Sequence, residues 1–527
     1  MPTTSIDNPE NSNLRRLSFI LKACVFATGC AAIVTEYTLA TLASYLLGDS
    51  ILQWTIVISL MLFSMGLGSR YSRKYKVRLL DCFVLIEFGL SFLCTFSAMF
   101  CFWISAYTIH FDLVVYGITC MIGFMTGLEI PLITRINQTY ESLRKNISSV
   151  MEYDYYGGLL GGALFAFVLL PFCGLTYTPV IIGSLNLVVA SLILWQFPDH
   201  LEQPRIFKIQ FTILLLVSGM AFAVANPIVL YGEQNKYKDK IVYQEQTRYQ
   251  KIVVTQWKDD FWLFLNGSTQ FSTYDEERYH EPLVHPAMGL IEERNNILLL
   301  GGGDGLAARE ILKYSDVESL TLVDLDPAMT RLAQEDKIFL NINQGSLNDP
   351  RVSVVNKEAY QFIKESGDLY DAIIIDLPDP KSVSLSLLYS LGFYKMVEKH
   401  LKPFGVIVTQ STSPLYSSKA FLCIKKTMQA AGFSIMSYQN SVPSMGQWGW
   451  QLGVKQKVMS PGLLKQKLMK HKLHNIQTRF FNRDAMVSMM HFGKGLFEKE
   501  GEVELSTQFN HNILKYYRQG SFFSQFS

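Results

Sequence analysis

Long apolar stretches dominate the first 230 residues of the chain. Seven of them are about 20 residues or longer and carry little charge: 18–46, 51–69, 79–104, 108–134, 155–173, 177–197 and 206–229. A bilayer core requires about 20 mostly apolar residues per helix. A helix buried in a soluble core would need a polar face, which these stretches almost entirely lack. The pattern predicts a membrane domain of about seven helices over residues 1–229.

After residue 230 the pattern changes to short apolar runs separated by polar segments. Three short β segments are expected at 241–244, 251–256 and 261–266, the last turning at Asn266-Gly267, and a helix from Asp275. Five further apolar runs, at 297–300, 320–323, 352–355, 372–375 and 406–409, alternate with segments of helix length. Such strands are typical of a parallel sheet covered on both faces. We expect an α/β, Rossmann-like domain with a small N-terminal β segment over 230–455, and a tail over 456–527 without predicted chemistry.

Charge follows the same division of the chain. Lys, Arg, Asp and Glu occupy 26 of the positions 1–225 but 66 of the positions 226–527. The net charge of +2 provides no concentrated basic field for nucleic acid. Seven of the eight cysteines lie in the apolar part, a distribution that fits neither a disulfide framework nor a zinc site. We therefore expect a lipid bilayer as a partner, no nucleic acid and no bound metal.

Basic residues in the loops between the apolar stretches indicate the orientation. They lie before the first stretch and in the second, fourth and sixth loops, which places the N-terminus in the cytoplasm. Seven crossings would put residues 230–527 outside, yet Lys236, Lys238 and Lys240 after the last stretch favour the inside. We expect a multi-pass protein of the cell (inner) membrane with a cytoplasmic second domain. The first stretch, interrupted by Glu36, is then expected to be bent or re-entrant.

Three carboxylates, Glu36, Glu87 and Glu129, lie deep within the apolar stretches. A charged group in a membrane span is costly and usually faces a bundle interior or a cavity. These residues are interpreted either as interhelical hydrogen-bonding groups or as part of a cation or polyamine path. The first interpretation is favoured, because three carboxylates without a positional relation specify no substrate.

The first of the five later strands leads directly into a glycine-rich loop, Gly301-Gly302-Gly303-Asp304-Gly305, before a helix expected from about Leu306. Glycines at 301, 303 and 305 permit a tight turn and a close approach of the backbone to a ligand. Asp324 ends the next strand, where a carboxylate can accept both hydroxyls of a ribose. This combination predicts a nucleoside site, and its glycine spacing suits the adenosine of S-adenosylmethionine better than a dinucleotide.

Asp304 indicates which form of S-adenosylmethionine the loop would bind. An anion in this loop would repel the α-carboxylate of S-adenosylmethionine but attract the amine of the decarboxylated compound. Two more acids, Asp376 and Asp379, follow the fourth of these strands at the sheet edge where α/β folds bind ligands. Asp379-Pro380 alone would also fit a turn. Paired acids suit a dicationic amine that must lose a proton before it acts as a nucleophile.

In this order along the chain, the motifs resemble the spermidine synthase (polyamine aminopropyltransferase) family. With the apolar N-terminal region, the chain is similar to the bacterial multi-pass membrane branch of that family. The resemblance covers about residues 240–455, and it implies a class I methyltransferase-like fold. It is carried by Tyr249-Gln250-Lys-Ile, Leu265-Asn-Gly-Ser-Thr-Gln270, Asp275-Glu276, Tyr279-His280-Glu281 and Gly301–Gly305, followed by the later acids.

The resemblance also implies roles for individual residues. Asp376 would be the catalytic base, assisted by Tyr279. The implied donor-binding residues are Gln250, Gly301, Gly303, Asp304, Gly305, the ribose acid Asp324, and the pair Glu358 and Ala359 near the adenine. The implied amine-binding residues are His280, Asp304, Asp376 and Asp379.

The implied activity is transfer of an aminopropyl group from decarboxylated S-adenosylmethionine to putrescine or a similar amine, giving spermidine and methylthioadenosine. The donor is a co-substrate, and no tightly bound cofactor is expected. Small polyamines are the expected partners, and a homo-oligomer is left open.

Two alternative functions also stay open. One is a membrane transporter or sensor whose second half only binds a nucleoside or polyamine, which Asp376 and Tyr279 disfavour. The other is a small-molecule methyltransferase of the same fold, which Asp304 disfavours.

Overall fold

The computed structural model describes residues 9–47, 50–105, 107–108, 110–470 and 476–520. The chain divides into two compact units, Met1–Lys240 and Ile241–Ser527. The bounds expected from the sequence for the membrane domain, the α/β domain and the tail remain predictions: 1–229, 230–455 and 456–527.

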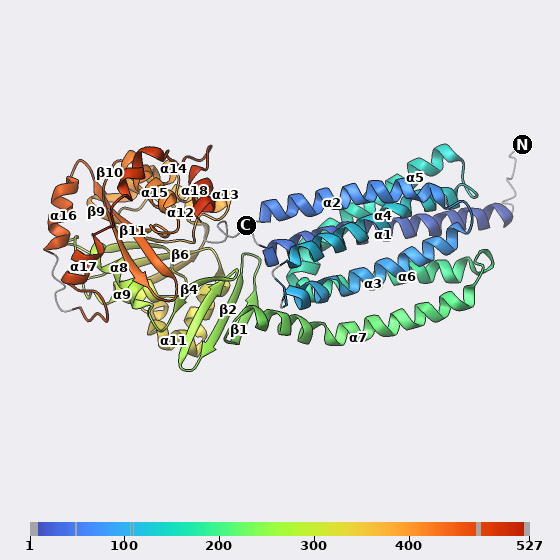
Figure 1. Cartoon of the computed structure of the whole chain (residues 1–527), viewed down its shortest axis with the longest axis horizontal. Coiled ribbons are helices and arrows are strands. Elements are labelled where there is room, and N and C mark those ends of the chain that lie inside the picture. Colours follow the sequence, from blue (N-terminus) through green and yellow to red (C-terminus); the bar gives the residue numbers. More distant parts are fainter. Residues whose placement is uncertain (1–8, 48–49, 106, 109, 471–475, 521–527) are drawn as a thin grey trace, which may run out of the picture. The chain divides into compact units, whose positions relative to one another are not determined.

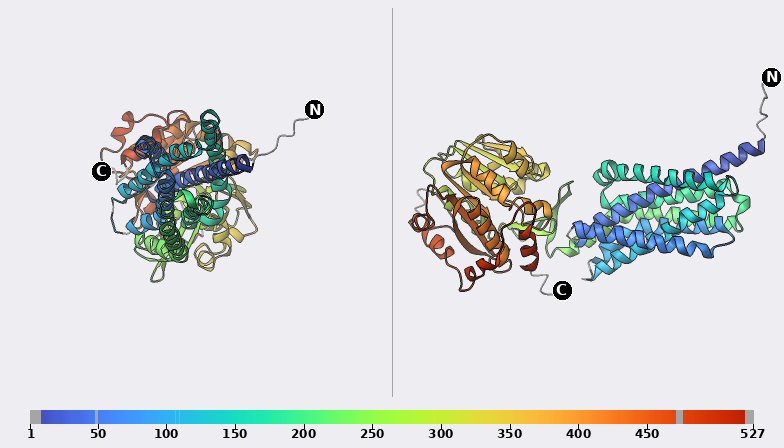
Figure 2. Two further views of the ribbon diagram at one scale, coloured as in Figure 1. Left: turned by 90° about the vertical axis from the view of Figure 1, so that its right-hand side faces the viewer. Right: turned by 90° about the horizontal axis from the view of Figure 1, so that it is seen from above.

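The first unit is a bundle of helices that run side by side (Figures 1 and 2). Its long helices are α1 (Pro9–Leu47), α2 (Ser50–Tyr71), α3 (Leu79–Ser105), α4 (Phe111–Asn137), α5 (Leu143–Leu164), α6 (Gly174–Gln196) and α7 (Pro204–Lys236). The shorter helical stretches are η1 (Ser72–Lys74), the π-helical η2 (Phe165–Cys173) and η3 (Pro198–His200). Glycines allow the closest approaches: a Cβ at Gly157 of α5 would lie 2.0 Å from the carbonyl oxygen of Phe26 in α1.

Six segments of the described residues are long and apolar enough to span a membrane by length and composition. The fifth, Leu143–Gln196, contains the expected stretch 155–173 and all but the last residue of the stretch 177–197. The two are interrupted at Gly174, whose φ is 63°. The expectation of a bent or re-entrant first stretch is wrong, because α1 continues through Glu36 without interruption. Glu36 lies at the bundle interior, where it is 8% exposed, and Glu87 and Glu129 are also buried.

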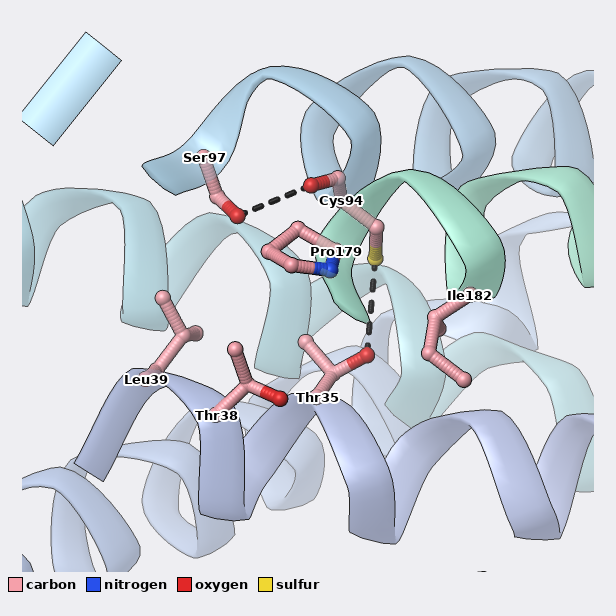
Figure 3. A pocket seen from close by; sticks show the side chains of 7 residues that line it. All are labelled: Thr35, Thr38, Leu39, Cys94, Ser97, Pro179 and Ile182. Carbon is pink, nitrogen blue, oxygen red and sulfur yellow. Dashed lines mark hydrogen bonds between the residues drawn. The ribbon is translucent and has the colours of Figure 1, made fainter. Parts of the chain in front are cut away.

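A small pocket lies between α1, α3 and α6 (Figure 3). It is lined by Thr35, Thr38, Leu39, Cys94, Ser97, Pro179 and Ile182. Thr35 Oγ1 and Cys94 Sγ are 3.6 Å apart, and the Ser97 hydroxyl donates to the Cys94 carbonyl oxygen over 2.8 Å. The hydroxyls of Thr35 and Thr38 also donate to the carbonyl oxygens of Ala31 and Val34 in α1. The lining of the pocket carries no charged side chain.

The second unit contains two sheets. Four antiparallel strands form the smaller one in the order β1 (Lys240–Gln246), β2 (Lys251–Trp257), β3 (Asp260–Leu265) and β4 (Ser268–Ser272). Asn266 and Gly267, with φ values of 50° and 75°, form the predicted two-residue turn before β4. The larger sheet has the order β10-β11-β9-β8-β5-β6-β7.

Five strands of the larger sheet are parallel, as predicted: β5 (Asn296–Gly301), β6 (Ser319–Asp324), β7 (Val352–Asn356), β8 (Tyr370–Asp376) and β9 (Leu401–Gln410). The antiparallel pair β10 (Phe433–Val442) and β11 (Gly446–Lys455) extends it beside β9. Side chains alternate between two cores. Ile297 and Leu299 of β5 pack in one of them, and Leu298 and Leu300 pack in the other.

Helices cover both faces of this sheet, as the strand pattern predicts. On the Ile297 side lie α8 (Glu277–Met288), α9 (Leu306–Leu312), α10 (Pro327–Glu335) and α11 (Lys337–Asn343), with the short η4 (Ser346–Asn348). On the Leu298 side lie α12 (Ala359–Glu365), α14 (Leu391–His400) and α15 (Ser418–Ala430), with α13 (Val383–Leu387). The described part of the tail contains α16 (Pro461–Met469), α17 (Arg483–Met489), η5 (Phe497–Glu502) and α18 (Asn512–Gly520), and it folds onto the same domain.

Candidate active site

The site forms where the order of the parallel strands reverses. The chain passes from β5 to β6 and β7 on one side and then returns to β8 on the other side of β5. Gly301 and Asp376 are register partners at the C-terminal ends of β5 and β8. Ligands of open α/β sheets bind at such a reversal, outside the carboxyl ends of the strands. The sequence-predicted glycine loop and acid pair therefore come together at this edge.

The glycines are required by close packing within the loop. Gly301 has a φ of 82°, and a Cβ there would lie 2.0 Å from the carbonyl oxygen of Asp376. A Cβ on Gly303 would lie 2.5 Å from Asp324 Oδ2, which accepts a hydrogen bond from the Gly303 N–H over 3.1 Å. The loop backbone thus sits directly against both predicted acids.

Asp324 is held at the end of β6 by the backbone. Its Oδ1 accepts the N–H of Asp326 over 2.9 Å, and its Oδ2 accepts that of Gly303. Burial raises the pKa of Asp324 to about 6, although these two hydrogen bonds oppose the rise. Because a carboxylate oxygen accepts more than one hydrogen bond, both oxygens can still receive the hydroxyls of a ribose.

The other predicted donor residues lie around Asp324. Lys357, next to Glu358, donates its backbone N–H to the Asp324 carbonyl oxygen over 3.0 Å. The Glu358 carboxylate caps α12 by accepting two backbone N–H groups, which places Ala359 at the first turn. Gln250 closes a turn with Thr247, whose hydroxyl donates to Asp326 Oδ2 over 2.8 Å. The β1–β2 turn is thereby tied to the loop that follows Asp324.

Asp376 and Tyr279 form the central contact of the site. The Tyr279 hydroxyl donates to Asp376 Oδ1 over 2.6 Å, from α8 to the end of β8. Burial raises the pKa of Asp376 to about 6; His280 and the Tyr279 hydrogen bond oppose the rise, and Asp304 adds to it. The Tyr279 ring packs against Trp448 and Trp450 of β11, at centroid distances of 6.1 and 5.6 Å. The result is an oriented carboxylate with a pKa suited to accept a proton near neutral pH.

His280 and Asp304 place opposite charges near this carboxylate. Burial disfavours the imidazolium, but the hydrogen bond to Glu276 and its charge raise the pKa of His280 to about 9. Its Nδ1 lies 3.1 Å from Glu276 Oε2, and Glu276 is also bound by Arg309. Asp304 Oδ1 accepts the N–H of Leu306 over 2.8 Å, and burial raises the Asp304 pKa although the nearby His280 charge opposes this. His280 therefore offsets part of the negative charge, and its role in amine binding stays a prediction.

Asp379, the second acid after β8, is bound by side chains that the sequence did not indicate. The Tyr517 hydroxyl donates to Asp379 Oδ2 over 2.9 Å, and the Gln410 amide lies 3.4 Å from Oδ1. Burial raises the pKa of Asp379; Lys381 and these two hydrogen bonds oppose the rise. Gln410 ends β9, so the rule that strand ends carry ligand residues could have found it. No sequence signal points to Tyr517.

One cluster beside the site has the side chains of a metal site. The ligand atoms of Glu281, His285 and Glu310 lie within 4.8 Å of one another. They are already engaged: Glu281 accepts the N–H groups of residues 479–481, and Glu310 bonds His285 over 2.9 Å. The Lys313 ammonium lies 2.6 Å from Glu310 Oε2, where a metal cation would bind. The cluster therefore serves as a buried ionic connection between α8, α9 and the tail.

The chain is similar to several known proteins. The family model described as "Spermine/spermidine synthase domain" matches residues 276–466. A polyamine aminopropyltransferase of Oceanobacillus iheyensis is 40% identical, with 88% of this chain and 89% of that protein covered. Polyamine aminopropyltransferase 2 of Aquifex aeolicus is also 40% identical, over 95% of this chain and 99% of that protein. A solved structure of spermidine synthase in complex with the transition state analogue AdoDATO is 24% identical, with a TM-score of 0.45, covering 50% of this chain and 89% of that chain. On the strength of the two full-length relatives, the chain belongs to the polyamine aminopropyltransferase family.

Proposed function

We propose that the second unit transfers an aminopropyl group from decarboxylated S-adenosylmethionine to putrescine, giving spermidine and methylthioadenosine. The observation that carries this proposal is the 2.6 Å hydrogen bond between Tyr279 and Asp376, next to the glycine loop. It provides an oriented base beside a nucleoside site. A protein that only senses or transports its ligand needs no such base, and the full-length relatives are named as transferases.

The donor is expected to lie across the ends of β5, β6 and β7. Asp324 would bind its ribose hydroxyls, Glu358 and Ala359 would flank the adenine, and Gln250 would cover it from the β1–β2 turn. Asp304 would attract the amine at the end of the aminopropyl chain. The same carboxylate disfavours S-adenosylmethionine, whose α-carboxylate would lie nearby.

The acceptor is a diamine that is dicationic in solution. Asp379 would hold the ammonium farther from the donor, and Asp376 would take the proton from the attacking nitrogen. That nitrogen forms a bond to the aminopropyl carbon beside the sulfonium as the carbon–sulfur bond breaks, and methylthioadenosine leaves as a neutral thioether. Positioning of the two reactants supplies much of the acceleration in such a displacement.

The first unit is proposed to anchor the enzyme in the cell membrane as a multi-pass domain with the lipid bilayer as its partner. Six segments of suitable length and hydropathy support this. Large apolar side chains also point outward from the bundle, among them Leu159, Phe167 and Phe172, which are 75, 77 and 82% exposed. Exposed apolar area of this kind marks an interaction surface, and on membrane-length helices the matching environment is lipid.

The test is an assay of the full-length protein purified in detergent. With decarboxylated S-adenosylmethionine and putrescine, we expect release of methylthioadenosine and formation of spermidine. With S-adenosylmethionine in place of the decarboxylated donor, we expect neither methylthioadenosine nor S-adenosylhomocysteine above background. Production of S-adenosylhomocysteine would instead identify a methyltransferase, and binding of either ligand without turnover would favour a sensor.

A further inference from the structure

The tail beyond the matched family domain folds back onto the catalytic domain. Three consecutive backbone N–H groups, of Arg479, Phe480 and Phe481, donate to Glu281 of α8 over 2.7–2.9 Å. Farther along, Ser506 accepts the N–H of Leu391 and donates its own to the Thr427 hydroxyl. The tail is thus fixed to both helical layers before it reaches its last helix.

The last described helix, α18, packs against α15 and α13, next to the acid pair. His511 Nδ1, just before it, lies 2.8 Å from the Ser386 hydroxyl of α13. Within α18, the Tyr516 hydroxyl accepts the backbone N–H of Glu504, a contact inside the tail. The next residue, Tyr517, donates instead to Asp379 Oδ2 over 2.9 Å. Two adjacent tyrosines therefore make different contacts: one holds the tail and one reaches the site.

Tyr517 is well placed to control the second acid. Asp379 follows β8 in a short loop, and Gln410 at 3.4 Å is a weak partner for Oδ1. The 2.9 Å bond to Oδ2 fixes the rotation of the carboxyl group. Three other titratable groups interact electrostatically with Asp379. The charge of Lys381 lowers the pKa of Asp379, and the charge of Asp379 raises the pKa values of Tyr279 and Tyr389.

We infer that Tyr517 is a positioning residue for the acceptor amine, which acts through Asp379, and that the C-terminal tail thereby completes the acceptor site. This inference rests on the proposed function, in which Asp379 holds the far ammonium of the diamine. A hydrogen bond donated to a carboxylate favours its charged form, and it also directs the free lone pairs of Asp379 toward one ammonium position. Among the described residues, the main packing partners of α18 are α15 and α13, and not β5, β6 and β7, whose ends form the proposed donor site.

The test compares Tyr517→Phe with Tyr516→Phe in the full-length enzyme. Each variant removes one hydroxyl from the same helix, but only the first alters a partner of Asp379. For Tyr517→Phe we expect the KM for putrescine to rise about tenfold, the loss that corresponds to one hydrogen bond to a charged group. The KM for the donor should stay unchanged. The acid limb of kcat/KM for putrescine should also move to higher pH, because the Asp379 carboxylate loses a stabilising donor.

Tyr516→Phe should leave both KM values and the pH profile close to those of the parent enzyme. The inference is overturned if Tyr517→Phe keeps the parent KM for putrescine and the parent pH profile. It is equally overturned if both variants raise the two KM values together, which would indicate a general loosening of the tail. A parent enzyme that releases no methylthioadenosine would refute the proposed function itself, and the role of Tyr517 would fall with it.

Discussion

At the scale of single residues, the site keeps carboxyl groups in places that disfavour their ionisation. Burial raises the pKa values of both Asp324 and Asp376 to about 6, whereas an unfolded chain would show values near 3.9. The folded state therefore binds these protons more tightly than the unfolded state does. The associated stability is present below about pH 4 and is lost as the pH rises through about 6. The folded protein is therefore less stable at neutral pH, where both carboxyl groups are ionised. Such a loss of stability is expected where buried acids are arranged for catalysis.

Asp376→Asn is the direct test of the proposed base. We expect turnover to fall by about 10²–10⁴, the usual contribution of a general base, while donor affinity stays within a few-fold. Because the variant removes an unfavourably buried charge, it should be at least as resistant to thermal unfolding at pH 7 as the parent protein. Methylthioadenosine release, donor titration and a melting curve report on the three quantities. Parent-level turnover in this variant would remove Asp376 from the role of base.

The pH profile tests the partnership of Asp376 with Tyr279. The base must be deprotonated, so kcat is expected to fall as the pH drops below about 6. Tyr279→Phe removes a hydrogen bond that stabilises the Asp376 carboxylate, and its acid limb should therefore move to higher pH. Tyr274→Phe is a suitable control, since that side chain is 65% exposed and outside the site. An acid limb that stays in place in Tyr279→Phe would show that another group titrates.

At the scale of elements, the pattern of short apolar runs separated by polar segments was sufficient to predict much of the catalytic domain. The five parallel strands were predicted because each is a nearly continuous apolar run, and the acids at their ends followed from the general rule for such sheets. The pair β10 and β11 was not predicted, because β10 is an edge strand with a mixed sequence, Phe433–Val442, and β11 contains Gly449 and Gly453.

The contact of Tyr517 with Asp379 illustrates the limit of such reasoning. It joins residues 138 positions apart, from a tail whose helices follow no strand pattern. Nothing local to Tyr517 encodes the partner, since the position of α18 depends on the packing of the whole tail. Asp379 itself was predicted, because its place after a strand is a local feature.

The β5–α9 loop offers an element-scale prediction. In Gly303→Ala, the new Cβ would meet the Asp324 carboxylate at 2.5 Å, so that side chain must rotate and lose its bond to the loop. We expect a raised KM for the donor with little change in the KM for putrescine, and Asp324→Ala should act in the same direction. Gly367→Ala provides the control, because its Cβ would meet nothing within 4 Å. Equal donor KM values in Gly303→Ala and Gly367→Ala would place the ribose elsewhere.

At the scale of the whole molecule, two units of different chemistry share one chain. The first buries carboxylates such as Glu87 and Glu129 among apolar helices. The second places four acids, Asp304, Asp324, Asp376 and Asp379, around one sheet edge. The division between them falls at Lys240/Ile241, shortly after the basic residues Lys236, Lys238 and Lys240. The proposed substrates of the second unit are cytoplasmic metabolites of the cell, so the side of the membrane on which it lies decides whether it can work.

The number of crossings determines that side. With the N-terminus in the cytoplasm, an even number of crossings returns the chain there and an odd number does not. Six segments of the described residues meet the criteria for spanning, but the fifth, Leu143–Gln196, has 54 residues and contains both α5 and α6, so these segments correspond to six or seven crossings. The basic residues Lys236, Lys238 and Lys240 after the last stretch favour the even number, and we predict that a reporter active only in the periplasm shows no activity when fused after Ser527. Fusions after Lys74 and after Tyr107 serve as references, since the loop charges place the former inside and the latter outside. Strong activity after Ser527, together with the expected results at both references, would mean that α5 and α6 cross separately and that the catalytic domain lies outside. The donor would then have to reach it beyond the membrane.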